Sequence, residues 1–123
     1  MDWKLELVAL PVTDVDRAKQ FYVEKLGFNA DMDATVSEEI RFVQLTPPGS
    51  ACSVAIGTGL GTMPPGSVQG LQLVVPDINA AREELVARGV EVSEVQHFDW
   101  GSFVFFSDPD GNGWAVQQIP ARD

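Results

Sequence analysis

Histidine, cysteine and basic side chains are scarce in this 123-residue chain, which contains one histidine, one cysteine and 8 lysine and arginine residues. The single cysteine, Cys52, cannot form a disulfide within the chain, and a chain of this length can bury enough apolar surface to fold without one. The formal net charge is -10 because 18 residues are acidic, so phosphate backbones and anionic lipid headgroups would be repelled. We therefore expect neither nucleic acid nor a membrane as a partner.

Long apolar runs are also missing. No segment approaches the roughly 20 consecutive apolar residues that a membrane-spanning helix needs. The first residues, MDWKLELV, lack the basic and then apolar pattern of a signal peptide. These absences predict a cytoplasmic protein, and the length together with 45% hydrophobic content predicts a single domain with one core.

An internal duplication is the most informative feature that is present. Residues 7–21 read LVALPVTDVDRAKQF, and residues 70–84, which lie 63 positions later, read GLQLVVPDINAAREE. Leu10, Val12, Asp14 and Ala18 of the first copy recur as Leu73, Val75, Asp77 and Ala81 of the second. Each copy predicts an apolar strand, at residues 5–12 in the first copy and 68–75 in the second. A helix follows, capped by Thr13 or Asp14 in the first copy and by Asp77 in the second, and it stops at Gly27 or Gly89.

Three short strand-like stretches follow each helix, near residues 28–33, 40–45 and 51–57 in the first half and near 90–97, 102–107 and 113–119 in the second. The order strand, helix, strand, strand, strand therefore occurs twice. We expect an α+β fold of two βαβββ modules that form a curved, cup-like mixed sheet with the helices outside. Module 1 would span residues 1–57, a connector rich in glycine and proline 58–67, and module 2 68–123.

Alternation along the strands predicts two different sheet faces. One parity carries large apolar residues that suit packing under the helices, such as Val8, Val54 and Leu73. The opposite parity carries mostly small residues, among them Ala9, Ser53, Ala55, Gly70 and Ala115, together with Gln72 and Gln117. Small side chains cannot fill a curved face, which favours a ligand cavity. The alternative is that Phe42, Phe103 or Phe105 fills the same space.

The segment DPDGNG at 108–113 matches the opening of a calcium-binding loop. The twelfth position of that loop would be Ile119, where calcium needs a bidentate glutamate. We therefore predict a tight turn between the last two strands, in which Gly111 has a positive φ.

The chain resembles the vicinal oxygen chelate superfamily, which includes glyoxalase I, extradiol dioxygenases, fosfomycin-modifying enzymes and bleomycin resistance proteins. Three segments carry the resemblance: LVALPVTDVDRAKQFYVEKLGF at 7–28, LQLVVPDINAAREELVARGVEV at 71–92 and FSDPDGNGWAVQQ at 106–118. It implies one glyoxalase/bleomycin-resistance-like domain and, for members of this length, a homodimer. Because this scaffold hosts both enzymes and binding proteins, the resemblance does not fix the activity.

In the metal-dependent members, metal ligands stand at positions that correspond here to Leu7, Gly70, Ala115 and Ser53. Leucine, glycine and alanine offer no side-chain donor to a metal, and serine is a poor one. The resemblance therefore implies no metal at the family position, and we expect no cofactor.

Five residues are the candidate ligand contacts: Ser53, Gln72, His97, Trp100 and Gln117. Trp100 lies in a predicted loop, HFDWGS, where an indole could stack on a flat ligand or cover the core. Gln72 and Gln117 can orient a ligand but cannot act as bases. His97, the only histidine, could donate or accept a proton near neutral pH, although a histidine beside a turn is more often only solvated.

These residues lead to three functional hypotheses. The first is metal-independent binding of a small hydrophobic or aromatic molecule, as in the antibiotic-sequestering resistance proteins of this family. The second is an enzyme, a glyoxalase-like lyase, an isomerase or a dioxygenase, with His97 or a carboxylate such as Asp99 moving the proton. The third is a regulatory or scaffold subunit whose cavity is filled by its own side chains.

Overall fold

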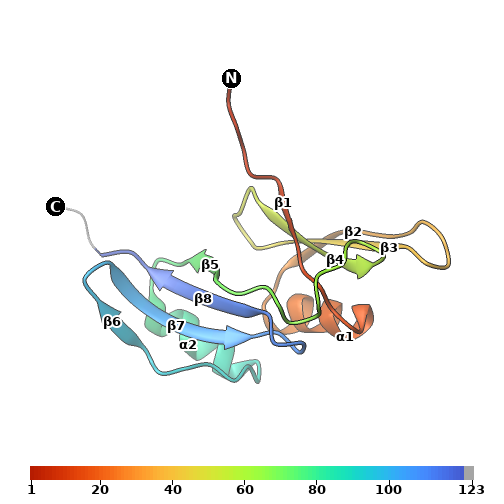
Figure 1. The fold of residues 1–123 in the computed structure, drawn as a ribbon. Coiled ribbons are helices and arrows are strands. Elements are labelled where there is room, and N and C mark those ends of the chain that lie inside the picture. Colours follow the sequence, from red (N-terminus) through yellow and green to blue (C-terminus); the bar gives the residue numbers. More distant parts are fainter. Residues whose placement is uncertain (121–123) are drawn as a thin grey trace.

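The computed structural model describes residues 1–120, and its strands form two four-stranded mixed sheets (Figure 1). In module 1, β1 (Leu7–Ala9), α1 (Val15–Gln20) and the π-helix η1 (Phe21–Lys25) precede β2 (Asn29–Thr35), β3 (Arg41–Thr46) and β4 (Ser53–Thr58). In module 2, β5 (Leu71–Val74) and α2 (Ile78–Ala87) precede β6 (Gln96–Phe98), β7 (Gly101–Ser107) and β8 (Gly113–Gln118). The strand orders are β1-β4-β3-β2 and β5-β8-β7-β6. The predicted α+β class and the two βαβββ modules are confirmed.

Both helices begin and end where the sequence predicts. The carboxylate of Asp14 accepts a hydrogen bond from the backbone N–H of Arg17, and that of Asp77 accepts from two N–H groups of α2. Gly27 and Gly89 follow the helices with φ of 74° and 82°, a conformation that only glycine adopts readily. Within residues 1–120, neither helix has the length and apolar character that crossing a membrane requires.

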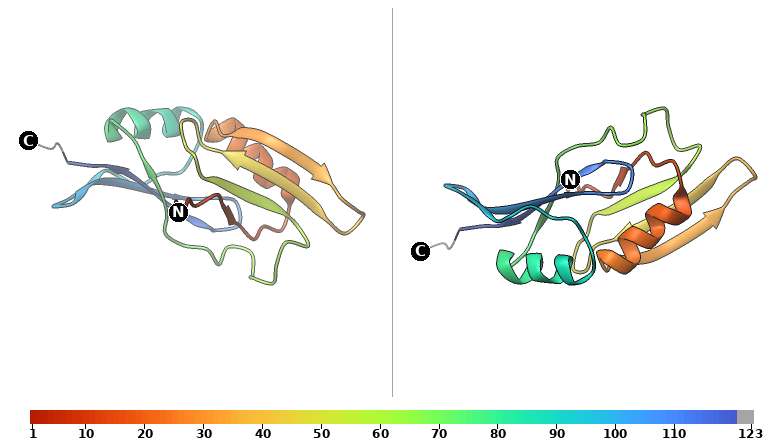
Figure 2. Two further views of the ribbon diagram at one scale, coloured as in Figure 1. Left: turned by 90° about the horizontal axis from the view of Figure 1, so that it is seen from above. Right: turned by 90° about the horizontal axis from the view of Figure 1, so that it is seen from below.

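The modules extend in opposite directions from a shared core. Figure 2 shows the two sheets reaching to either side while α1 and α2 lie on the same side of the molecule. One cluster of buried apolar side chains spans both modules, and in it Tyr22 and Phe28 of module 1 contact Trp114 of module 2. The two modules therefore share one core within a single chain.

Three predicted strands are shorter than expected. The strand predicted near 90–97 is formed only at its end, as β6, while β1 covers three of the residues predicted at 5–12 and β5 four of those predicted at 68–75. Ser93 explains the first difference, because its hydroxyl accepts the N–H of Phe105 at 2.9 Å and so replaces a backbone partner. A side chain thus interrupts the expected ladder between this segment and β7.

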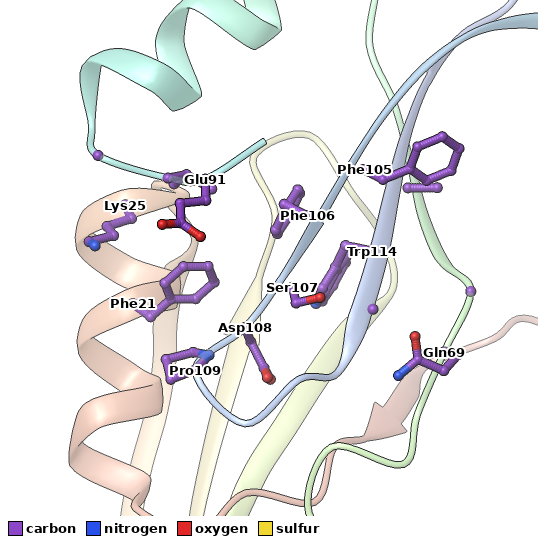
Figure 3. A pocket seen from close by; sticks show the side chains of 15 residues that line it. Phe21, Lys25, Gln69, Glu91, Phe105, Phe106, Ser107, Asp108, Pro109 and Trp114 are labelled. Atoms are coloured by element: carbon purple, nitrogen blue, oxygen red, sulfur yellow. The ribbon is translucent and has the colours of Figure 1, made fainter. Parts of the chain in front are cut away.

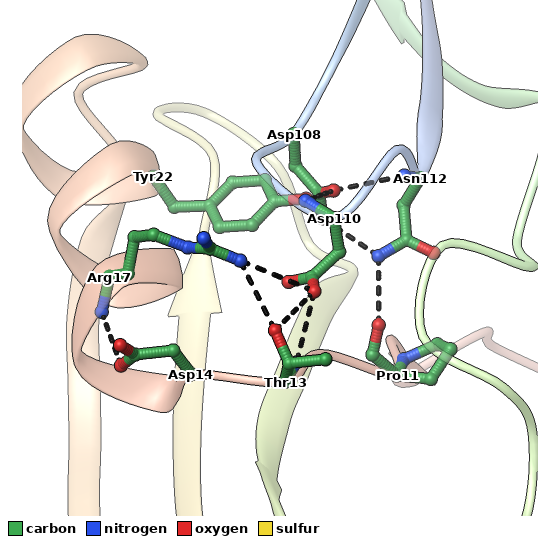
Figure 4. Close-up of polar contacts among 8 residues, drawn as sticks. All are labelled: Pro11, Thr13, Asp14, Arg17, Tyr22, Asp108, Asp110 and Asn112. Carbon is green, nitrogen blue, oxygen red and sulfur yellow. Dashed lines mark hydrogen bonds and ion pairs between the residues drawn. The ribbon is translucent and has the colours of Figure 1, made fainter.

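The DPDGNG turn joins the modules (Figure 4). Asp108 Oδ1 accepts the backbone N–H groups of Asp110 and Asn112 at 3.0 and 2.9 Å, and Gly111 has φ of 98°. Asn112 also donates to the carbonyl of Pro11 at 3.0 Å. The predicted tight turn is therefore present, and its side chains also bind module 1.

A buried chain of hydrogen bonds continues from this turn into the core. The Tyr22 hydroxyl donates to Asp108 Oδ2 at 2.7 Å and accepts the indole N–H of Trp114 at 3.0 Å. Burial of the phenol, followed by the nearby negative charge of Asp108, raises the pKa of Tyr22 far above its ordinary value. Tyr22 thus stays protonated in the folded protein.

We expect stability to fall above about pH 10, by about 1.4 kcal/mol for each pH unit, because Tyr22 ionises only in the unfolded chain. The unfolded state then binds one proton fewer than the folded state, so a rise in pH favours unfolding. Since Tyr22 is the only tyrosine, its absorbance can be followed directly. Tyrosinate should appear only as the protein unfolds, and Tyr22→Phe should remove this part of the pH dependence. Ionisation of Tyr22 near pH 10 in a protein that is still folded would contradict the expectation.

Candidate ligand-binding face

The second sheet carries an exposed aromatic surface on the side away from its helix. Strand pairing places Val74 beside Gln117 and Gln117 beside Phe103, and it places Gln72 beside Ala115 and Ala115 beside Phe105. All these side chains share one face, because residues paired across neighbouring strands point to the same side of a sheet. We call this surface the aromatic face and define it by Gln72, Val74, Phe98, Trp100, Phe103, Phe105, Ala115 and Gln117.

Its aromatic rings form a continuous series of contacts. Trp100 and Phe98 are stacked with centroids 5.0 Å apart and planes 11° apart, and Phe98 meets Phe103 edge-on at 5.8 Å. Phe103 and Phe105 follow, 6.0 Å apart and almost parallel. Trp100 is 63% exposed and Phe98 42% exposed, so the outer rings of the series are open to solvent. Neighbouring exposed apolar side chains of this size are typical of a binding surface.

Two glutamines add polar groups to the aromatic face. Gln72 donates from Nε2 to Oε1 of Gln117, and Gln117 Nε2 donates to the backbone carbonyl of Trp100 at 2.9 Å. The second bond holds the Trp100 loop against the sheet. The two glutamines therefore share one face, as strand parity predicts, and the carbonyl oxygen of Gln72 and its remaining amide hydrogen stay free to bind a ligand.

His97 lies on the opposite face of the same sheet. It pairs with Ser102, which in turn pairs with Gln118. These residues are the chain neighbours of Phe103 and Gln117, so their side chains point to the other side of the sheet. Its Nδ1 lies 2.7 Å from the hydroxyl of Ser102. The structure thus brings Gln72, Trp100 and Gln117 together but does not place His97 with them. Asp99 is exposed in the turn between β6 and β7.

Ser53 lies in the first sheet, apart from the glutamines. It is 4% exposed, and its hydroxyl is 2.6 Å from that of Thr46 and accepts from the Gln44 amide at 3.3 Å. Strand pairing puts Leu7 beside Ser53, on the face of this sheet that points away from α1. Within one chain, Ser53 and the two glutamines occupy different sheets.

The positions that hold metal ligands in the metal-dependent relatives provide few donors here. Leu7, Gly70 and Ala115 have no donor atoms, and Ser53 already takes part in two hydrogen bonds. Across residues 1–120, no three histidine, cysteine or acidic side chains converge as a metal ion would require. The described side chains therefore do not fit a metal centre of the family type.

A cavity of about 820 Å³ borders the aromatic face (Figure 3). Phe105 and Ala115 line it from that face, Gly70 lines it where β5 begins, and Phe21 and Lys25 line its far side. A Cβ atom on Gly70 would meet open space, although its φ of 84° favours glycine there. This volume suits a small organic molecule.

Sequence reasoning identified part of this site and missed part of it. Phe103 and Phe105 were expected only as possible fillers of the cavity, and Phe98 was not considered. Phe103 is buried, but Phe105 remains 39% exposed and so offers a surface as well as occupying space. Phe98 lies two residues after Gln96 and so points to the same face of the sheet, and Gln96 pairs with Phe103. This signal could be used only if the β6–β7 register were known.

Comparison with known proteins gives a consistent result. Residues 4–116 match the family model of the Glyoxalase/Bleomycin resistance protein/Dioxygenase superfamily. YetH of Bacillus subtilis (strain 168) is 33% identical over 115 residues, which cover 90% of this chain and 94% of YetH.

Two solved structures share the fold over nearly the whole chain. TnmS3, an antibiotic binding protein from Streptomyces sp. CB03234, has a TM-score of 0.88 at 37% identity, covering 97% of this chain and 98% of TnmS3. A superfamily member from Sphaerobacter thermophilus DSM 20745 has a TM-score of 0.83 at 31% identity, covering 95% of this chain and 98% of that protein.

Proposed function

The chain belongs to the Glyoxalase/Bleomycin resistance protein/Dioxygenase superfamily, and from that membership we propose that it binds a small, planar hydrophobic or aromatic molecule on its aromatic face. Binding needs no metal and leaves the ligand chemically unchanged, and the protein acts in the cytoplasm as a sequestering protein of the antibiotic-resistance type. The observation that carries the proposal is the pair of stacked, exposed rings of Phe98 and Trp100, continued by Phe103 and Phe105, beside a neutral glutamine pair. TnmS3 supports it, because that protein is an antibiotic binding protein with the same fold.

The chemistry of the aromatic face suits capture better than proton transfer. Stacking on the indole of Trp100 and burial against Phe105 would supply affinity, while Gln72 would orient a polar group of the ligand. Neither glutamine titrates. His97 faces the other side of the sheet, so it could not reach a ligand that is stacked on Trp100 without a change of register.

We further propose that a second copy of the chain completes the site. The aromatic face is uncovered in one chain, and so is the part of the corresponding face of the first sheet that β2 forms, where Met32 is half exposed. A homodimer that places the first sheet of one copy over the aromatic face of the other would bring Ser53 opposite Gln72 and Gln117. All five ligand contacts except His97 would then surround one cavity.

We expect Trp100→Ala to weaken the binding of acridone, a neutral tricyclic probe with one N–H and one C=O, by about tenfold or more, because stacking on an indole is lost. Calorimetric titration measures the affinity, and chromatography of the recovered probe detects any turnover. Trp3→Ala is the matched control, since Trp3 is 88% exposed in the segment before β1.

Three results would support the proposal together: affinity that falls in the Trp100 variant and not in the control, a melting temperature raised by acridone, and recovery of unaltered acridone. Equal affinities in the two variants would reject the aromatic face as the site. A chemically altered probe would reject simple binding in favour of an enzyme. Weak binding by the globular probe 2-adamantanone would show that planarity matters.

A further inference from the structure

A second cavity lies on the opposite side of the second sheet from the aromatic face. Its volume is about 460 Å³, within the range of small-molecule pockets. Leu73, Val116 and Phe106 form its floor, and strand alternation points these side chains away from Gln117. Residues 47–50 of module 1 and the helix α2 form its walls. The cavity is therefore a crevice between the two modules on the helix side of the sheet, and Gln72 and Val74 of the edge strand β5 border it as well as the aromatic face.

The cavity exists because α2 covers its sheet less completely than the first helix does. Of α2, only Ile78 is fully buried, whereas α1 and η1 bury Val15, Ala18, Phe21 and Tyr22. Ala81 and Leu85 face the cavity and are only half-buried, as is Leu73 across from them. An apolar surface is thus left open to water although the helix stands beside it, and an apolar ligand segment would gain dispersion contacts there.

Two cations, one from each module, stand at the rim of this cavity. Lys25 ends η1 and Arg88 ends α2, and both line the cavity. The two cations lie close to the glycines that follow the helices: a Cβ on Gly27 would lie 2.8 Å from Nη1 of Arg88, which is too close, and one on Gly89 would lie 4.0 Å from Nζ of Lys25, which is ordinary contact. Each cation therefore reaches toward the end of the other module's helix.

The charge at this rim is not fully balanced. Arg88 pairs with Glu84 at 2.8 Å, whereas Lys25 makes no ion pair within the described part of the chain. The chain has a net charge of -10 and only 8 basic residues, yet two of them line this one apolar crevice. Glu84 is the one acidic residue that lines it with them. A bound anion would reduce the repulsion between the two cations.

We propose that this crevice binds an amphipathic anion, an unbranched alkyl carboxylate whose chain lies against Leu73, Ala81 and Leu85 and whose carboxylate lies between Lys25 and Arg88. The apolar walls select the alkyl chain and the two cations select its charged end. The alkyl chain would lie on the helix side of the sheet, whereas the aromatic face lies on the other side; only the edge strand β5 borders both.

The test titrates decanoate into the full-length protein and follows binding by calorimetry and by the methyl NMR signals of Leu73, Ala81 and Leu85. We expect saturable binding of one decanoate per chain, shifts of these three residues, and weaker binding of 1-decanol, which lacks the charge. Lys25→Gln should weaken decanoate binding by at least about fivefold. Lys4→Gln, which removes the same charge from an exposed residue before β1, should leave it unchanged.

Equal affinities in the Lys25 and Lys4 variants, the absence of saturable binding, or shifts confined to the aromatic face would overturn the proposal. Ala81→Phe provides a second check, since an added ring should fill the crevice and prevent decanoate binding while the melting temperature shows that the variant folds. Acridone binding should be unaffected by Ala81→Phe, because Ala81 does not line the cavity beside the aromatic face. Failure at one site can therefore be distinguished from failure at the other.

Discussion

Replacing Asp108 with alanine is expected to lower the free energy of unfolding by about 3 to 5 kcal/mol, because a buried carboxylate that accepts four hydrogen bonds is removed. Two of these bonds come from the backbone of the turn, one from Tyr22 and one from the Asn112 amide. Each donor left without an acceptor in the core costs about 1 to 3 kcal/mol, and these costs overlap within one network. Denaturation by urea, monitored by tryptophan fluorescence, measures the change.

The effect should extend beyond the turn, because Asp108 connects the modules. Through Tyr22 it holds η1 against β8, and through Asn112 it holds Pro11 in the segment between β1 and α1. A domain of this size has a stability of about 5 to 15 kcal/mol, so the variant would retain only a small margin. We expect one cooperative transition in both proteins, since the core is shared between the modules.

The isosteric variant separates charge from shape. Asp108→Asn keeps one oxygen for the two backbone donors but presents an amide to Tyr22 and Asn112. Its free energy of unfolding should therefore lie between that of the wild type and that of the alanine variant. Asp2→Ala is the matched control, because it removes the same charge from an exposed residue before β1. A loss below about 1 kcal/mol in Asp108→Ala would show that water replaces the carboxylate at little cost.

The sequence was sufficient to predict those parts of the fold that local chemistry determines. Thr13 or Asp14 was expected to cap the first helix and Asp77 the second, because a short polar side chain satisfies free N–H groups there, and Asp14 and Asp77 do so. Strand parity correctly placed Gln72 and Gln117 on one face, because alternation is fixed once a strand is recognised.

Features that depend on register or on distant contacts could not be predicted. The face of His97 is set by the β6–β7 turn, where Phe98 pairs with Gly101, and a shift of one residue would reverse it. The π-helix at Phe21–Lys25 buries the adjacent aromatic residues Phe21 and Tyr22 against the other module. No local sequence pattern predicts this π-helix, because the partners of the two buried rings, Phe106 and Trp114, lie far along the chain.

The second large effect is expected from Val74→Asp, which should raise the dissociation constant of the proposed homodimer by about 100-fold or more. Val74 is 60% exposed on β5, an edge strand of the aromatic face, and a second copy would bury it. A carboxylate there would lose its hydration without a partner. In a twofold interface each substitution acts twice, so a cost of about 1.4 kcal/mol per site already gives this factor.

Val86→Asp is the matched control, because Val86 is a valine of similar exposure, 51%, on α2 rather than on the aromatic face. Sedimentation equilibrium should show a dimer for the wild type and for Val86→Asp but a monomer for Val74→Asp.

Added salt should strengthen the wild-type dimer, since two chains of charge -10 repel each other. Acridone affinity should fall together with dimerisation, because the monomer presents only one wall of the site. A wild type that stays monomeric at high concentration, or equal dimerisation in both variants, would show that another partner or the ligand alone covers the aromatic face.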